Sequence, residues 1–151
     1  MRRLERGVIL DASVGVKFVV AEEGHETARA LLEEAVRGEV PVAFPEFATL
    51  EVANALWVKA RRRELTAALA RAGLALFIRV TLRFIRVPER LLAPEALAIA
   101  LGHGVTAYDG CYLALARRTE LPLLSADAKL ATPTLRKAFD VVLLKELERR
   151  L

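Results

Sequence analysis

Four acidic residues form the set in this chain that is best placed to do chemistry together. They are Asp11, Glu51, Asp109 and Asp127. Carboxylates a few ångström apart raise one another's pKa unless they bind a cation, and a site built of oxygen ligands selects a hard ion such as Mg²⁺ or Mn²⁺. Such an ion activates a water molecule and stabilises the charge that develops on phosphorus during phosphodiester hydrolysis. Convergence of the four side chains would therefore indicate a metal-dependent phosphodiesterase.

Other reactive residues of the chain do not suggest a competing centre. The two histidines, His25 and His103, lie in unrelated segments, and the single Cys111 has no neighbouring ligand in the sequence, so a zinc site is not expected. A catalytic thiol would also need a histidine base nearby. We therefore expect Cys111 to pack in the core.

The acids must be positioned by short apolar segments that alternate with helical ones. The expected strands are Val8–Leu10, 41–44, 82–87, 121–124 and 140–143; the expected helices are His25–Arg37, 45–63, 65–80, 94–101, 106–118 and 126–130, followed by a charged terminal helix. This alternation predicts a three-layer α/β/α fold with a short, mostly parallel central sheet. The third strand has an alternative, because Arg83 and Arg86 could instead continue a helix.

A parallel sheet would bring the acids to one edge, because the functional crevice lies at the carboxyl ends of the strands. Asp11 directly follows the first strand, and Asp127 comes three residues after the fourth. Asp109 opens the helix before that strand, and Glu51 lies in the helix that follows the second strand. The residues expected to support these acids are Ser13, Asn54 and Ser125.

Each acid also has a purely structural interpretation. Asp11 or Ser13 could cap the next helix, and Thr106 with Asp109 matches a capping box. Ser125 could cap the short helix at 126–130 and leave Asp127 to complement its dipole. Glu51 resists this interpretation, since it lies beyond the first turn of a mostly apolar helix, where an unpaired acid would be costly. The set therefore argues for a site more strongly than any one member does.

Length and composition suit a single domain over residues 1–151. The net charge of +4 permits a nucleic-acid partner without requiring one. Hydrophobic residues make up 54% of the chain, and with glycine counted the share exceeds the roughly 45–50% that is usual for soluble domains. We therefore expect an oligomer or a tightly bound partner. We expect no membrane span and no signal peptide, and the lone cysteine fits a reducing cytoplasm.

The segments around the acids resemble those of PIN domains, most closely the VapC toxins of prokaryotic toxin–antitoxin pairs. The matching blocks are Val-Ile-Leu-Asp11-Ala-Ser13, Pro45-Glu-Phe-Ala-Thr-Leu-Glu51-Val-Ala-Asn54, Thr106-Ala-Tyr-Asp109-Gly-Cys-Tyr-Leu-Ala-Leu-Ala and Leu-Leu-Ser125-Ala-Asp127-Ala-Lys-Leu. The resemblance implies an Mg²⁺- or Mn²⁺-dependent endoribonuclease whose metal ligands are Asp11, Glu51, Asp109 and Asp127. It also implies a homodimer, with a tetramer left open, and a cognate antitoxin that blocks the site. Two positions depart from the pattern: Gly110 stands where Ala is more usual, and Ser125 where Thr is common.

Two other functions remain open from the residues. A phosphotransfer module, such as a phosphatase with an aspartyl nucleophile, would also place acids on a doubly wound sheet, but Asp11-Ala-Ser13 lacks the second acid that such enzymes need. A non-catalytic oligomeric binding protein would use the surplus apolar surface and would not need an intact set of four acids. Finally, the basic run from Lys59 to Arg63 is either a solvated helix end or a contact for RNA phosphates.

Overall fold

A computed structural model describes residues 4–148 and places five strands in one parallel sheet. The strands are β1 (Val8–Leu10), β2 (Val42–Pro45), β3 (Ile85–Val87), β4 (Leu123–Ser125) and β5 (Val141–Leu143). Their order across the sheet is β3-β2-β1-β4-β5, and every neighbouring pair is parallel. The chain reverses its direction of winding between β1 and β4. In open α/β sheets such a switch point is where the functional crevice forms.

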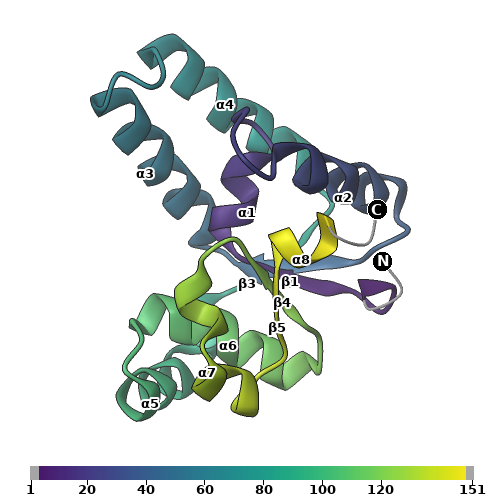
Figure 1. Cartoon of the computed structure of the whole chain (residues 1–151), viewed down its shortest axis with the longest axis vertical. Helices are drawn as coiled ribbons and strands as arrows, with labels where there is room; N and C mark the ends of the chain where they lie inside the picture. Colours follow the sequence, from purple (N-terminus) through teal and green to yellow (C-terminus); the bar gives the residue numbers. More distant parts are fainter. Residues whose placement is uncertain (1–3, 149–151) are drawn as a thin grey trace.

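Helices cover both faces of the sheet, as the alternating pattern predicts. They are α1 (Ala12–Lys17), α2 (His25–Arg37), α3 (Ala48–Arg61), α4 (Ala67–Val80), α5 (Ala93–His103), α6 (Ala107–Thr119), α7 (Pro133–Ala138) and α8 (Leu144–Glu148), with 3-10 turns η2 (Glu89–Leu91) and η3 (Ala128–Ala131). Figure 1 shows α1 to α4 and α8 on one side of the sheet and α5 to α7 on the other. The α3–α4 hairpin extends well beyond the sheet (Figure 1). The predicted three-layer α/β/α architecture is confirmed.

The central strands are buried on both faces and read as continuous apolar runs. All three residues of β1 are buried, and so are all the residues of β2, β4 and β5. This explains why the sequence shows no alternation of apolar and polar residues in these segments. β3 differs from these four strands because Ile85 is exposed and its other two residues are only partly buried.

The third strand is present but shorter than expected. It begins at Ile85 rather than at residue 82, because the chain first completes a turn after α4, in which Phe84 N–H donates to Thr81 O. Arg86 does not continue a helix. Its guanidinium donates to the Thr81 hydroxyl at 3.1 Å and lies over the ring of Phe44.

Several helix boundaries also differ from the sequence prediction. The third helix begins at Ala48, because Pro45 is still the last residue of β2, where it pairs with Val87. The fifth helix passes Gly102 and ends at Gly104, whose φ of +67° is the left-handed conformation that favours glycine. The sequence analysis missed α7, although Thr132 caps it and Pro133 opens it, which is a common start signal.

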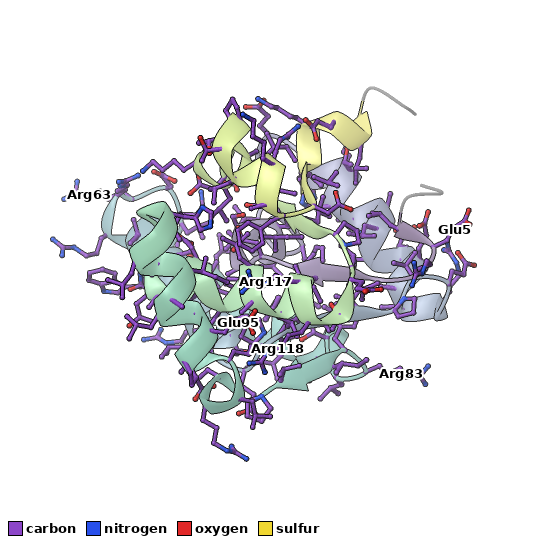
Figure 2. The ribbon with its side chains drawn as sticks, turned by 90° about the horizontal axis from the view of Figure 1, so that it is seen from below. Glu5, Arg63, Arg83, Glu95, Arg117 and Arg118 are labelled. Atoms are coloured by element: carbon purple, nitrogen blue, oxygen red, sulfur yellow. The ribbon has the colours of Figure 1, made fainter. Side chains whose placement is uncertain are left out.

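Helices α5 and α6 form a closely packed pair beneath the sheet. A Cβ added to Gly110 of α6 would lie 2.4 Å from the carbonyl oxygen of Ala96 in α5, so the two backbones touch at this glycine. On the surface of the pair, Glu95 forms ion pairs with Arg117 and Arg118. Figure 2 shows these three side chains gathered on one face. The contact at Gly110 is next to Asp109, so it also sets the place of that acid.

Within residues 4–148, none of the helices is both long enough and apolar enough to cross a bilayer.

Candidate active site

Asp11 occupies the switch point of the sheet. It follows β1 directly, and its backbone N–H donates to Leu124 O in β4, which holds the two strand ends together. Its side chain is only 7% exposed. Although Asp11 occupies the N-cap position of α1, its carboxylate makes no capping hydrogen bond. The helix-cap interpretation of this residue is therefore wrong.

Two serine hydroxyls hold the Asp11 carboxylate in place. Ser13 donates to Oδ2 at 2.5 Å and Ser125 donates to the same oxygen at 2.6 Å. The hydroxyls are themselves fixed, because Ser13 Oγ accepts from the Ala126 N–H and Ser125 Oγ accepts from the Asp127 N–H, both at 2.9 Å. Both serines use Oδ2. Within the described residues, Oδ1 is thus the oxygen of Asp11 that is open to a ligand.

Glu51 points from α3 toward the same edge and is partly buried. Its Oε1 accepts a hydrogen bond from the Tyr112 hydroxyl at 2.7 Å. The pKa of Glu51 is raised from 4.5 to about 7, chiefly by burial and also by the charges of Asp11 and Asp109, while the Tyr112 bond lowers it. A half-buried acid with a pKa near neutrality is unusual on a helix face that only packs, and it is typical of a functional site.

Asp109 lies in the first turn of α6. Thr106 caps this helix, and its hydroxyl accepts from the backbone N–H of Asp109 at 3.1 Å. The expected cap is therefore real, but this bond uses the main chain of Asp109 and not its carboxylate.

Asp127 is exposed and has a capping role. It is the N-cap of η3, where Oδ1 accepts from the Lys129 N–H at 2.9 Å. Asp127 rather than Ser125 caps this turn, which corrects the structural interpretation of both residues. The capping bond engages only one of the two carboxylate oxygens.

Electrostatic coupling ties the four acids into one group. The pKa of Asp11 is raised, chiefly by burial and further by the negative charges of Asp109 and Asp127, while the Ser125 and Ser13 bonds lower it. Asp11 and Asp109 raise the pKa of Glu51 in the same way. A set of mutually repelling carboxylates, one of them buried, carries an excess of negative charge that a bound cation would neutralise.

The remaining candidate residues are Asn54 and Cys111. Asn54 is exposed and lines an open hollow beside Glu51, together with Phe47 and Leu50. Cys111 is buried, and burial raises the pKa of its thiol, so the expected packing role is confirmed.

Only some of the basic side chains from Lys59 to Arg63 are available to bind a ligand. Lys59 forms ion pairs with Glu22 and Glu64. Arg61 lies over the ring of Trp57 at 5.1 Å. Arg63 lies in the turn between α3 and α4, and Figure 2 shows it at the outer end of that hairpin. Lys59 is thus a structural cation, whereas the arginines remain exposed.

A family model for the PIN domain matches residues 8–133, which is most of the chain. The chain belongs to the PIN-domain family. The ribonuclease VapC3 of Pyrobaculum aerophilum is 38% identical over 127 residues, which cover 82% of this chain and 92% of that protein. The resemblance seen in the sequence is thereby confirmed.

Solved structures have the same PIN fold. The crystal structure of PAE2754 from Pyrobaculum aerophilum matches with a TM-score of 0.70 at 23% identity, over 97% of this chain and 89% of that one. The structure of Mycobacterium tuberculosis VapC20, a toxin that cleaves the sarcin–ricin loop, matches with a TM-score of 0.63 at 17% identity, over 88% of this chain and 96% of that one.

The carboxylates at the acidic edge of this PIN domain do not enclose a metal ion by themselves. Among residues 4–148, no three histidine, cysteine or acidic side chains lie close enough together to hold a metal ion directly. Magnesium in proteins usually keeps several waters and takes only one or two carboxylates, with phosphate oxygens completing its shell. The donor set, with its oxygen ligands and excess negative charge, fits an ion bound in that way.

Tyr112 is the site residue of this PIN domain that the sequence analysis missed. A signal for it was present, since Tyr112 follows Asp109 by three residues and therefore lies on the same side of α6. Its hydrogen bond to Glu51 joins segments that are 61 residues apart, and that pairing cannot be read from helical spacing.

Proposed function

We propose that this PIN domain is an endoribonuclease that hydrolyses RNA phosphodiester bonds with the help of Mg²⁺ or Mn²⁺. The observation that carries the proposal is the buried Asp11 carboxylate at the switch point, with Oδ2 tied to two serines and Oδ1 open. The similarity to a ribonuclease of the VapC group supports RNA as the substrate. We also propose that residues 1–151 form one domain.

In this proposal Asp11, Glu51, Asp109 and Asp127 hold the metal ion, one or two of them as direct ligands and the others through its bound waters. Ser13, Asn54 and Ser125 support these acids. A bound ion would lower the pKa of a water molecule and offset the charge that grows on phosphorus. Ser13 and Ser125 hold the Asp11 carboxylate in a single orientation. The Asp11 side chain therefore loses little conformational freedom when the metal ion binds. The cap of α6 uses the backbone N–H of Asp109 and leaves its carboxylate unused. The cap of η3 uses only one carboxylate oxygen of Asp127.

The rival functions have less support. A phosphatase with an aspartyl nucleophile needs a second acid beside it, which the segment Asp11-Ala-Ser13 lacks. A non-catalytic binding protein would have no reason to keep two acids with raised pKa values at the switch point.

We further propose that the protein acts as the toxin of a toxin–antitoxin pair in the cytoplasm. The resemblance to VapC toxins supports a cognate antitoxin that covers the acidic edge. The same resemblance supports a homodimer, and the surface offers apolar side chains for one: Leu50 and Trp57 on α3 and Leu97 and Leu101 on α5 are all more than half exposed.

The test is cleavage of a structured RNA pool by the purified protein, with Mn²⁺ or with EDTA. We expect cleavage that requires the metal and disappears in both Asp11→Asn and Asp109→Asn, with melting curves showing that both variants remain folded. Full activity in the two variants would contradict the site, and cleavage that EDTA does not affect would contradict the role of the metal.

A further inference from the structure

Tyr112 connects three of the elements that carry the acidic site. The residue belongs to α6, three residues after Asp109, and its hydroxyl donates to Glu51 of α3 at 2.7 Å. The backbone N–H of Ala12, next to Asp11 at the start of α1, also interacts with this hydroxyl. The oxygen of one side chain thus lies where the segments of three acids meet.

The ring of Tyr112 is held rigidly. It is only 1% exposed, and Phe47 packs edge-on against it with the ring centres 5.6 Å apart. Phe47 directly precedes α3, so the same pair of rings sets the distance between α3 and α6 near Glu51. A hydroxyl on a fixed ring can fix its partner in turn, since it has no alternative position.

Packing alone does not explain this hydroxyl. A phenylalanine would fill the same space against Phe47, and a buried hydroxyl costs free energy unless it is hydrogen-bonded. Its acceptor is a carboxylate that has lost part of its hydration and has no described cation beside it. The bond uses Oε1, so it selects one rotamer of a long and otherwise flexible side chain and turns that side chain toward Asp11.

We propose that Tyr112 is a positioning residue for the metal site. It holds the Glu51 carboxylate at the acidic edge before any ion binds. The inference rests on the proposed function, because it assumes that Glu51 is a ligand. Hydrogen bonds to ligating carboxylates orient them, and loss of such a partner typically lowers metal affinity by about 10- to 100-fold.

The experiment compares wild type with Tyr112→Phe and with Tyr108→Phe as a matched control. Tyr108 is on the same helix and also packs edge-on against Phe47, but it is 63% exposed and its hydroxyl has no partner among the described residues. Mn²⁺ binding is measured by electron paramagnetic resonance titration, and RNA cleavage is measured over a range of Mn²⁺ concentrations. Thermal melting without metal reports on the fold.

For Tyr112→Phe we expect Mn²⁺ affinity to fall by about tenfold or more, with the Mn²⁺ concentration for half-maximal cleavage rising in parallel. Cleavage should largely recover at saturating Mn²⁺, and Tyr108→Phe should match wild type. In a Glu51→Ala background, Tyr112→Phe should have no further effect on Mn²⁺ binding, because the residue acts through Glu51.

Three results would overturn the inference. One is unchanged Mn²⁺ affinity in Tyr112→Phe, and another is loss of cleavage by the same factor at every Mn²⁺ concentration. The third is loss of cooperative melting, which would show that the fold itself needs the hydroxyl. If wild type binds Mn²⁺ but cleaves no RNA, the ribonuclease proposal fails while the binding comparison still decides the role of Tyr112. If wild type binds no Mn²⁺, both proposals fail.

Discussion

The hydroxyl of Ser125 at the end of β4 lies 2.6 Å from Oδ2 of Asp11 at the end of β1, although the two residues are 114 positions apart. The same hydroxyl accepts from the Asp127 N–H, so one buried serine connects two of the acids. This contact exists because β1 and β4 are neighbours in the sheet, with Leu10 paired to Leu124. It is not a helix-capping contact, and it supports the site proposed at the acidic edge.

Ser125→Ala should weaken both the site and the fold. The substitution removes a donor to the buried Asp11 carboxylate and leaves the part-buried Asp127 N–H without its acceptor, so we expect the unfolding free energy to fall by about 1–3 kcal/mol. Cleavage at low Mn²⁺ should fall by about tenfold, because Asp11 loses an orienting partner. Urea unfolding and initial cleavage rates measure the two effects. Ser125→Thr keeps the hydroxyl and should retain activity; an equal loss in both variants would contradict the role of the hydroxyl.

The metal-free protein should become less stable as pH rises from about 4.5 to about 7. The pKa of Glu51 is raised in the folded state from 4.5 to about 7, so folding favours its protonated form. Its contribution to stability is fully present below 4.5 and is lost as pH rises through the folded value near 7. The raised pKa of Asp11 acts in the same direction. Because Glu51 is partly exposed, we expect a total effect of only about 1–2 kcal/mol.

Urea unfolding at both ends of that pH range measures this effect. Glu51→Gln should flatten the dependence, since the amide does not titrate, and saturating Mn²⁺ should flatten it in wild type by neutralising the carboxylates. Stability that instead rises with pH across the range, or that is unchanged by Glu51→Gln, would show that Glu51 does not have the raised pKa.

Gly110→Ala should destabilise the α5–α6 pair. The added methyl would meet the Ala96 carbonyl at 2.4 Å, and a backbone atom cannot move aside as a flexible side chain can. We expect a loss of about 1–3 kcal/mol, measured by thermal melting. The departure from the alanine that is more usual in PIN domains thus has a physical reason in this chain, namely the close approach of α5.

Gly102→Ala is the matched control for that substitution. Gly102 lies inside α5, its added Cβ would have no neighbour within 4 Å, and its φ is not positive. The change should leave stability equal or raise it by about 0.5–1 kcal/mol, because alanine is the better helix former. A similar loss in both variants would indicate that any alanine in this helix pair is harmful and would contradict the clash.

Glu95→Ala should lower stability by about 0.5–1 kcal/mol at low salt. Its carboxylate forms ion pairs with both Arg117 and Arg118 and is only 19% exposed, whereas the two arginines are about half exposed (Figure 2). The loss should shrink in high salt, which screens these charges. The pair of Arg37 with Glu39 provides the control, because the Glu39 side chain is 55% exposed, and Glu39→Ala should cause no measurable change in melting. A salt-independent loss would point to packing instead.

Much of the fold could be predicted from local pattern. Buried parallel strands are short apolar runs, and Val8–Leu10 was placed correctly because Asp11 ends it abruptly. Gly24 and Gly38 marked both ends of α2, since each adopts a positive φ. One error fell where two signals compete at one position. Pro45 can end a strand or open a helix, and only its pairing with Val87 decides between these roles.

The sequence by itself determined the types of the acids and their places relative to strand ends, because residues that follow buried parallel strands must emerge at one edge of the sheet. It did not determine which structural bonds each acid makes. Ser125 became a partner of Asp11 only once β4 lay beside β1. The pairing of Tyr112 with Glu51 was likewise decided by the packing of α6 against α3. Local patterns depend on neighbours along the chain, whereas these contacts join segments 61 and 114 residues apart, whose distance is set by strand order and helix packing.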